Sequence, residues 1–211
     1  MSVLARPFML TVAKIVHALN SMDAGITAIR DELNAADRNL GDGDTGMTVA
    51  QVVAAWSRVA PSLPPDVGAA LLALGSETSR ASGSSLGAVL AIFLSAAGRS
   101  VRGKQALSRS DMVMALSTAT KAVCERSGAS AGDKSVIDSW LAIERHLDAV
   151  DDNANLLAEA LLAAHDCLLE FRARESKLGR ARIYGAKSMG HDDPGMLAVM
   201  RLLSASQGMS G

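Results

Sequence analysis

The sequence has few aromatic residues and no uninterrupted apolar run long enough to cross a membrane. Aromatic residues make up 3% of the 211 residues, whereas hydrophobic residues make up 49%. The interior must therefore be built mainly from Ala, Leu, Val and Met, and such side chains favour closely packed helices over an aromatic-rich sheet. A membrane span needs about 20 consecutive apolar residues, so we expect no membrane association.

Cysteine is also scarce, and the chain has no excess of positive charge. Cys124 and Cys167 are too few and too far apart for a disulfide framework or a cysteine-based metal site, which favours a reducing cytoplasm. The formal net charge is −1 without a polybasic run, which argues against nucleic acid as a partner. In residues 1–20, Lys14 and His17 interrupt the apolar run, which favours an amphipathic helix over a signal peptide.

Helical periodicity dominates the chain, and we find neither an alternating strand nor an internal repeat. The predicted helices are 8–20, 25–33, 48–59, 66–74, 84–97, one starting at Ser110, 135–149, 153–174 and 196–206. The segment 84–97 is apolar on nearly every face, which predicts a position at the centre of a bundle. The predicted fold is all-α, a single domain over 1–211 with about eight antiparallel helices.

Four polar, glycine-containing loops interrupt the predicted helices. They cover residues 37–46, 79–87, 127–134 and 179–195. The first loop contains GDGDTG at 41–46, which fits the dinucleotide-binding pattern G-x-G-x-x-G. That pattern normally follows a strand and binds a pyrophosphate, whereas the preceding residues do not resemble a strand and the two aspartates would repel phosphate.

The same loop carries three carboxylates, Asp37, Asp42 and Asp44, in the pattern D-x4-D-x-D. Three acidic groups this close repel one another unless a cation lies among them, and their oxygens suit Mg²⁺ or Ca²⁺. An EF-hand is excluded because counting from Asp42 places Val53 where the bidentate Glu should be. The alternative is a solvated turn in which an aspartate caps the next helix.

The second and third loops carry weaker signals. Small residues at 82–85 offer N–H groups and hydroxyls to an anion at a helix N-terminus, or form an ordinary N-cap with Gly87 providing close helix packing. In the third loop, Lys134 could lie near a phosphate, or Asp133 and Ser135 could merely cap a helix.

The fourth loop, 179–195, is long and unusual. It contains three basic residues, four glycines and the only tyrosine, Tyr184. Loops this long in compact domains are usually lids or binding segments. His191 is a candidate general base or metal ligand, although a lone histidine in a glycine-rich loop more often serves hydrogen bonding or packing.

Together, the four motifs resemble the nucleotide-binding L subunit of dihydroxyacetone kinases and the C-terminal L domain of the ATP-dependent members of that family. The motifs, in order, are DRNLGDGDTG, ASGSSLG, GDKSVIDSW and GRARIYGAKSMGHDDPG. The resemblance covers nearly the whole chain and implies an eight-helix, up-and-down barrel with a phosphate-binding pocket at one end. It also implies that Asp37, Asp42 and Asp44 bind two Mg²⁺ ions that bridge the phosphates of ADP or ATP.

The resemblance also implies which residues contact the nucleotide. They are Thr45, Gly46, Met47, Thr48, Ala81, Ser82, Arg180, Asp193, Pro194 and Gly195. The last loop then covers the adenine and ribose, and no side chain is needed as a covalent nucleophile. The ketose is expected on a separate K-type subunit, because this chain contains no recognisable K portion.

Several alternatives stay open at this point. Ser79-Arg80 replaces a Gly-Gly pair of the family and Thr45 replaces the usual His or Cys, so the identity of the ketose is undecided. The phosphoryl source is either ATP or a phosphotransferase-system protein, and the chain could form a homodimer. A non-catalytic nucleotide-sensing or regulator-binding module is the competing function, and a Ca²⁺-binding structural protein is disfavoured by the EF-hand count.

Overall fold

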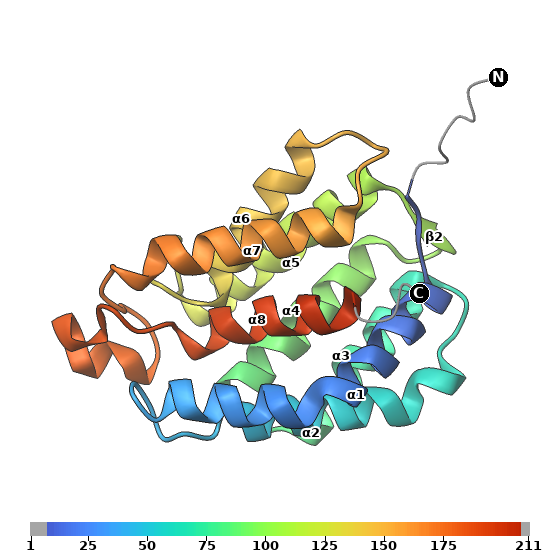
Figure 1. The fold of residues 1–211 in the computed structure, drawn as a ribbon. Coiled ribbons are helices and arrows are strands. Elements are labelled where there is room, and N and C mark those ends of the chain that lie inside the picture. Colours follow the sequence, from blue (N-terminus) through green and yellow to red (C-terminus); the bar gives the residue numbers. More distant parts are fainter. Residues whose placement is uncertain (1–7, 208–211) are drawn as a thin grey trace.

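The structure of the protein is a computed structural model that describes residues 8–207, and it contains eight α-helices in that range (Figure 1). Their bounds are α1 Val12–Asp37, α2 Thr45–Val59, α3 Val67–Ala81, α4 Ser85–Ser100, α5 Arg109–Ser127, α6 Val136–Ala149, α7 Leu156–Arg172 and α8 Pro194–Gln207. Two parts of the predicted domain 1–211 lie outside the described residues. They are 1–7, the start of the segment 1–20 that we interpret as amphipathic, and 208–211, the end of the domain.

Shorter elements complete the fold. Two 3-10 helices, η1 Ala60–Ser62 and η2 Arg180–Ser188, lie in connections between α-helices. The strands β1 Leu10–Thr11 and β2 Ala106–Leu107 form one antiparallel pair. Two-residue strands are too short to leave an alternating pattern in the sequence.

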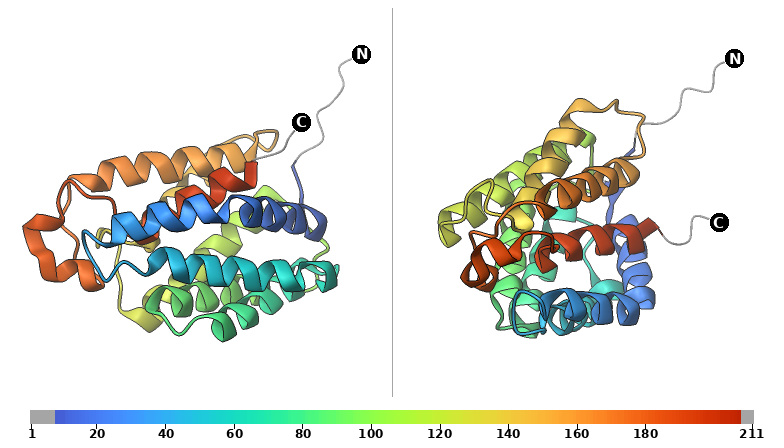
Figure 2. Two further views of the ribbon diagram at one scale, coloured as in Figure 1. Left: turned by 60° about the horizontal axis from the view of Figure 1, so that its bottom comes forward. Right: turned by 60° about the vertical axis from the view of Figure 1, so that its left-hand side comes forward.

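The helices run up and down, and each packs mainly against its neighbours in the chain. The longest-range packing joins α1 to α8 and closes the arrangement (Figure 2). This confirms the predicted all-α, antiparallel fold. Within residues 8–207, no helix is both long enough and apolar enough to cross a membrane.

Helix starts follow the capping chemistry of the sequence. The Asp66 carboxylate accepts a hydrogen bond from Ala69 N at the start of α3, at 2.6 Å. At the start of α5, Ser108 Oγ accepts from Asp111 N while the Asp111 carboxylate accepts from Ser108 N, at 3.2 and 3.1 Å. These contacts satisfy N–H groups that have no partner inside the helix, and they fix where each helix begins.

Two predictions about the helices are wrong. Residues 12–20 and 25–33 of the two predicted helices belong to one helix, α1, which changes direction along its length but is not interrupted between them (Figure 1). Residues 8–11 precede α1 and include the strand β1. The apolar helix α4 lies in the wall between α3 and α5 and not at the centre. Its large side chains, such as Leu86 and Leu90, are only partly buried, and its buried residues are Gly and Ala.

Small residues allow α3 and α4 to approach closely, as the composition predicts. A Cβ atom at Gly68 would lie 2.5 Å from Gly98 O, and one at Gly98 would lie 2.6 Å from Gly68 O. A Cβ atom at Gly75 would lie 2.8 Å from Ser95 Oγ. No larger residue fits between these two backbones without moving a helix.

We therefore expect Gly98→Ala to lower the free energy of unfolding by about 1–3 kcal/mol, the usual cost of overpacking. Gly25→Ala is the matched control, because its new Cβ would lie 3.9 Å from its nearest neighbours. That control should stabilise the protein by roughly 0.5–1 kcal/mol, since Ala replaces Gly inside a helix. Urea denaturation measures both changes, and equal stabilisation by the two substitutions would contradict the close approach of α3 and α4.

Candidate functional site

The four loops lie at the same end of the bundle because the helices alternate in direction. The connections α1–α2, α3–α4, α5–α6 and α7–α8 are all odd-to-even turns, so they share one end. Figures 1 and 2 show the α1–α2 loop and η2 together at that end. The candidate site is therefore built from loops on a rigid helical frame.

The three predicted metal ligands come together in the α1–α2 loop. Each of Asp37, Asp42 and Asp44 offers a carboxylate oxygen, and these oxygens lie within 4.8 Å of one another. Asp37 is buried, whereas Asp42 and Asp44 are exposed. A cluster of three hard oxygen donors, open to solvent on one side, fits a cation such as Mg²⁺ that keeps other positions for water or phosphate.

Asp37 also organises the start of α2. Its Oδ2 accepts hydrogen bonds from Asp44 N at 2.9 Å and Thr45 N at 3.0 Å. Asp44 occupies the N-cap position but makes no side-chain capping bond. The capping alternative thus applies to Asp37, whereas the Asp44 side chain caps no N–H group.

Two glycines leave room for this geometry. A Cβ atom at Gly41 would lie 2.3 Å from Asp37 Oδ1, and one at Gly46 would lie 2.0 Å from Arg30 O. The loop therefore passes directly over Asp37, and α2 begins directly against α1. Any side chain at either position would displace the carboxylate or the helix.

Sequence reasoning missed Asn34, one turn before Asp37 on α1. Its Oδ1 accepts a hydrogen bond from Met47 N at 3.2 Å. Asn34 and Asp37 together bind three N–H groups in the segment 44–47. The i, i+3 spacing of two polar side chains at the end of an amphipathic helix was the available signal.

The second loop is shorter than predicted, because 79–81 end α3 and 85–87 begin α4. Ser82 Oγ donates to Ser84 Oγ at 2.9 Å, and Ser84 Oγ accepts from Gly87 N at 3.0 Å. This is the N-cap of the simpler alternative, with Gly87 packed against Ser82. Arg80 is exposed on α3 and pairs with Glu77, so it does not point into the site.

In the third loop the structure agrees with the helix-capping alternative, with Ser135 as the N-cap of α6, and not with a Lys134 exposed towards a phosphate. The Lys134 side chain is 1% exposed and bonds to backbone carbonyl oxygens. The buried Asp138, which the sequence did not single out, organises the turn. Its carboxylate accepts from Gly132 N at 2.6 Å and from Ser135 N at 2.9 Å.

The fourth loop contains the 3-10 helix η2, so it is more ordered than a glycine-rich connection suggests. We call residues 179–193 the lid segment. Arg180, at its start, forms an ion pair with Asp42. This contact joins the lid segment to the acidic cluster.

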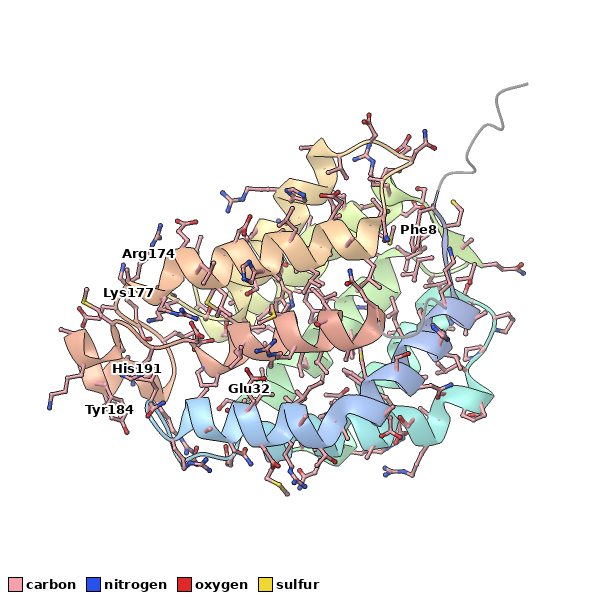
Figure 3. The ribbon with its side chains drawn as sticks, in the orientation of Figure 1. Phe8, Glu32, Arg174, Lys177, Tyr184 and His191 are labelled. Atoms are coloured by element: carbon pink, nitrogen blue, oxygen red, sulfur yellow. The ribbon has the colours of Figure 1, made fainter. Side chains whose placement is uncertain are left out.

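The end of the lid segment leads into α8. Asp193 Oδ1 accepts from Met196 N at 2.9 Å, and Pro194 and Gly195 form the first turn of α8. Burial raises the pKa of the Asp193 carboxyl to about 6, against the lowering effect of nearby N–H groups and of Lys134. His191 is exposed, and both His191 and Tyr184 lie at this end of the molecule (Figure 3).

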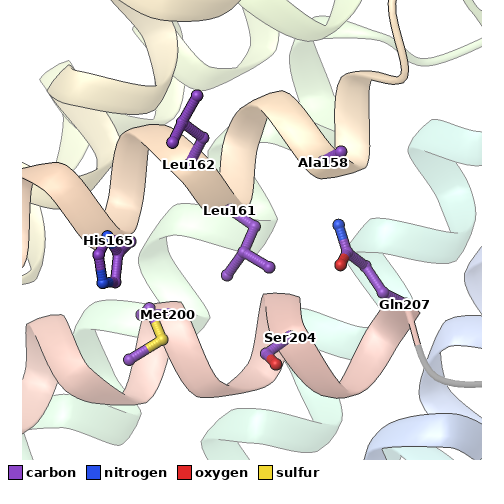
Figure 4. A pocket seen from close by; sticks show the side chains of 7 residues that line it. All are labelled: Ala158, Leu161, Leu162, His165, Met200, Ser204 and Gln207. Carbon is purple, nitrogen blue, oxygen red and sulfur yellow. The ribbon is translucent and has the colours of Figure 1, made fainter.

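An apolar groove of about 350 Å³ lies elsewhere, between α7 and α8 (Figure 4). It is lined by Ala158, Leu161, Leu162, His165, Met200, Ser204 and Gln207. It contains no carboxylate and no residue of the four loops, so it does not offer the groups that a phosphate or a divalent cation needs.

Comparison with known families gives a match to the DAK2 domain over residues 39–207. The chain belongs to the DAK2 domain family. This confirms the resemblance found in the four motifs. The DAK2 match begins just after Asp37, so the first of the three clustered carboxylates lies immediately before the matched range.

Relatives of this DAK2 chain include single subunits and parts of longer proteins. It is 26% identical to the ADP-binding subunit DhaL of the PEP-dependent dihydroxyacetone kinase of Escherichia coli, covering 92% of this chain and 95% of that subunit. It is 30% identical to the dihydroxyacetone kinase of Citrobacter freundii, covering 92% of this chain and 35% of the relative. It therefore spans only about a third of the longer relatives.

A solved structure supports the same fold. The crystal structure of the C. freundii dihydroxyacetone kinase matches with a TM-score of 0.74 and 23% identity, covering 97% of this chain and 36% of the kinase chain. The structure of that kinase in complex with AMP-PNP and Mg²⁺ matches with a TM-score of 0.70. At this identity, the match shows that the DAK2 chain shares the fold.

Proposed function

We propose that this chain is a single-domain, nucleotide-binding subunit of a short-ketose kinase, which binds Mg²⁺ with ADP or ATP and acts with a separate K-type subunit. The observation that carries the proposal is the cluster of Asp37, Asp42 and Asp44, whose oxygens lie within 4.8 Å of one another. The E. coli relative is an ADP-binding subunit of a dihydroxyacetone kinase, which supports the same role.

The carboxylates of the cluster are suited to hold two Mg²⁺ ions. When bound, Mg²⁺ neutralises phosphate charge and aligns the groups for phosphoryl transfer. Asp37 supplies the fixed ligand, because two N–H groups at the start of α2 hold its Oδ2. Asp42 and Asp44 supply the exposed ligands. The Mg²⁺ complex of the C. freundii kinase, which has the same fold, supports this assignment.

The remaining contacts surround the acidic cluster. The first turn of α2, Thr45 to Thr48, presents the positive end of the helix to the phosphates, while the N–H groups of Thr45 and Met47 donate to Asp37 and Asn34. Ala81 and Ser82 border the site from the α3–α4 loop. Arg180, which pairs with Asp42 in the free protein, is free to turn to a phosphate once the carboxylate binds a cation. Asp193, Pro194 and Gly195 close the site at the start of α8.

Phosphoryl transfer also needs an acceptor. The resemblance of the four motifs implies that the ketose is held elsewhere, and two relatives, the dihydroxyacetone kinase of C. freundii and the L-erythrulose 1-kinase of Mycolicibacterium smegmatis, are named for short ketoses. We therefore assign the ketose to the K-type subunit. The phosphoryl source is ATP or a phosphotransferase-system protein that rephosphorylates bound ADP.

Thermal unfolding tests the binding site. With Mg²⁺ and ADP at about 100 times the Kd, binding adds about 2.7 kcal/mol to stability, and we expect a rise in Tm of roughly 5–10 °C for a chain of this size. Removing Mg²⁺ with EDTA or introducing Asp42→Asn should abolish the rise. Asp23→Asn, an exposed substitution on α1, is the matched control and should keep it. An undiminished rise in EDTA and in Asp42→Asn would refute the metal assignment.

A reconstituted kinase assay tests the activity. The chain alone should not phosphorylate dihydroxyacetone or erythrulose, whereas addition of a K-type subunit and either phosphoryl source should give turnover. Asp44→Asn should lower kcat by at least about 100-fold, the order seen when one electrostatic stabiliser of a transition state is removed. Asp23→Asn again serves as the control. Nucleotide binding without transfer for any K-type partner would identify a nucleotide-sensing module instead.

A further inference from the structure

Lys134 is the largest fully buried side chain among the described residues, and it is a cation with 1% exposure. Burying a charge is costly unless the charge is well paired or hydrogen-bonded. Lys134 is also the one non-glycine residue of the described chain with a positive φ, 60°. A strained backbone and a buried charge at the same position call for a compensating role.

The ammonium group is held by three backbone carbonyl oxygens. Lys134 Nζ donates to Arg174 O at 2.8 Å, to Ser188 O at 2.9 Å and to Arg172 O at 3.3 Å. An ammonium has three donors, and each has a partner. Arg172 and Arg174 lie at the C-terminal end of α7, where carbonyl groups carry partial negative charge, while Ser188 is the last residue of η2.

The lid segment has little apolar packing to hold it in place. Only Ala181 and Ser188 of η2 are buried, and Ile183 is 81% exposed. Without an apolar core of its own, the lid segment depends on polar contacts at its ends.

Those polar contacts converge on the same point. Ser176 N donates to Ser188 Oγ at 2.8 Å, and Ser188 Oγ donates to Gly185 O at 2.6 Å. Gly190 N donates to Arg172 O at 2.8 Å, which is also an acceptor for Lys134. Asp192 also accepts two hydrogen bonds from the Arg172 guanidinium, both at 2.7 Å, in a more exposed ion pair. Lys134 therefore provides the buried part of the contacts that attach the lid segment to α7.

We propose that Lys134 is a positioning residue that fastens the lid segment to the end of α7 and so sets where Arg180 and the 193–195 turn lie. The part of this proposal that concerns nucleotide binding rests on the proposed function, whereas the attachment of the lid segment does not. Arg180 starts the lid segment and pairs with Asp42, and Asp193 ends it. A cation that does not touch the nucleotide thus determines how both ends of the lid segment meet it.

Hydrogen–deuterium exchange and calorimetry test the proposal on the full chain. In Lys134→Met, amides of residues 185–190 should exchange at least about tenfold faster without any nucleotide, because their exchange follows local opening. The Kd for Mg²⁺–ADP should rise about tenfold or more, since only the ordered lid segment binds well. Lys177→Met, an exposed neighbour on the α7–η2 connection, is the control and should change neither quantity.

The outcomes separate the proposals. Faster lid exchange with an unchanged Kd would overturn the positioning role and leave a purely structural lysine. Unchanged exchange would overturn the attachment itself. Failure of the unsubstituted protein to bind Mg²⁺–ADP would refute the proposed function but not the attachment.

A measurement on the unsubstituted protein covers the case in which Lys134→Met does not fold. The amides of Ser176 and Gly190 donate into the attachment point, so they should be protected together and open together. Independent exchange of these two amides at unprotected rates would show that Lys134 does not hold the lid segment.

Discussion

The candidate site depends on one carboxylate, that of Asp37, at the junction of two helices. Asp37 is the last residue of α1, and its Oδ2 accepts hydrogen bonds from Asp44 N and Thr45 N at the start of α2. The interaction joins the end of α1 to the start of α2, and the Asp37 carboxylate that makes it also belongs to the cluster with Asp42 and Asp44. The same contact that determines the local fold therefore assembles the acidic cluster, and glycines at 41 and 46 leave space for it.

Much of the fold follows from patterns that are local in the sequence. Helix starts were predictable near Asp66 and Ser84 because these residues carry their capping chemistry with them. The helix expected from Ser110 begins at Arg109, with Ser108 as its N-cap. The acidic cluster was predictable because its three members lie within eight residues, which limits their separation whatever the remaining fold. Antiparallel helices then bring the four loops to one end without any further information.

The incorrect predictions concern properties that depend on distant segments. The expected break between residues 20 and 25 does not occur, since packing of α1 outweighs the cost of the glycine at 25. The apolar faces of α4 are shared between α3 and α5, so hydrophobicity alone did not locate it. The burial of Lys134 depends on carbonyl groups 38, 40 and 54 positions further along the chain. No local pattern in the sequence encodes such contacts.

The central claim is that Asp37, Asp42 and Asp44 bind a divalent cation that contacts a nucleotide phosphate. Anomalous diffraction from a crystal grown with Mn²⁺ and ADP tests it most directly, because Mn²⁺ accepts the same oxygen ligands as Mg²⁺. The account predicts an anomalous peak at about 2.0–2.3 Å from oxygens of the cluster and bridged to a phosphate oxygen. Bound nucleotide with no metal peak at these three carboxylates would contradict it.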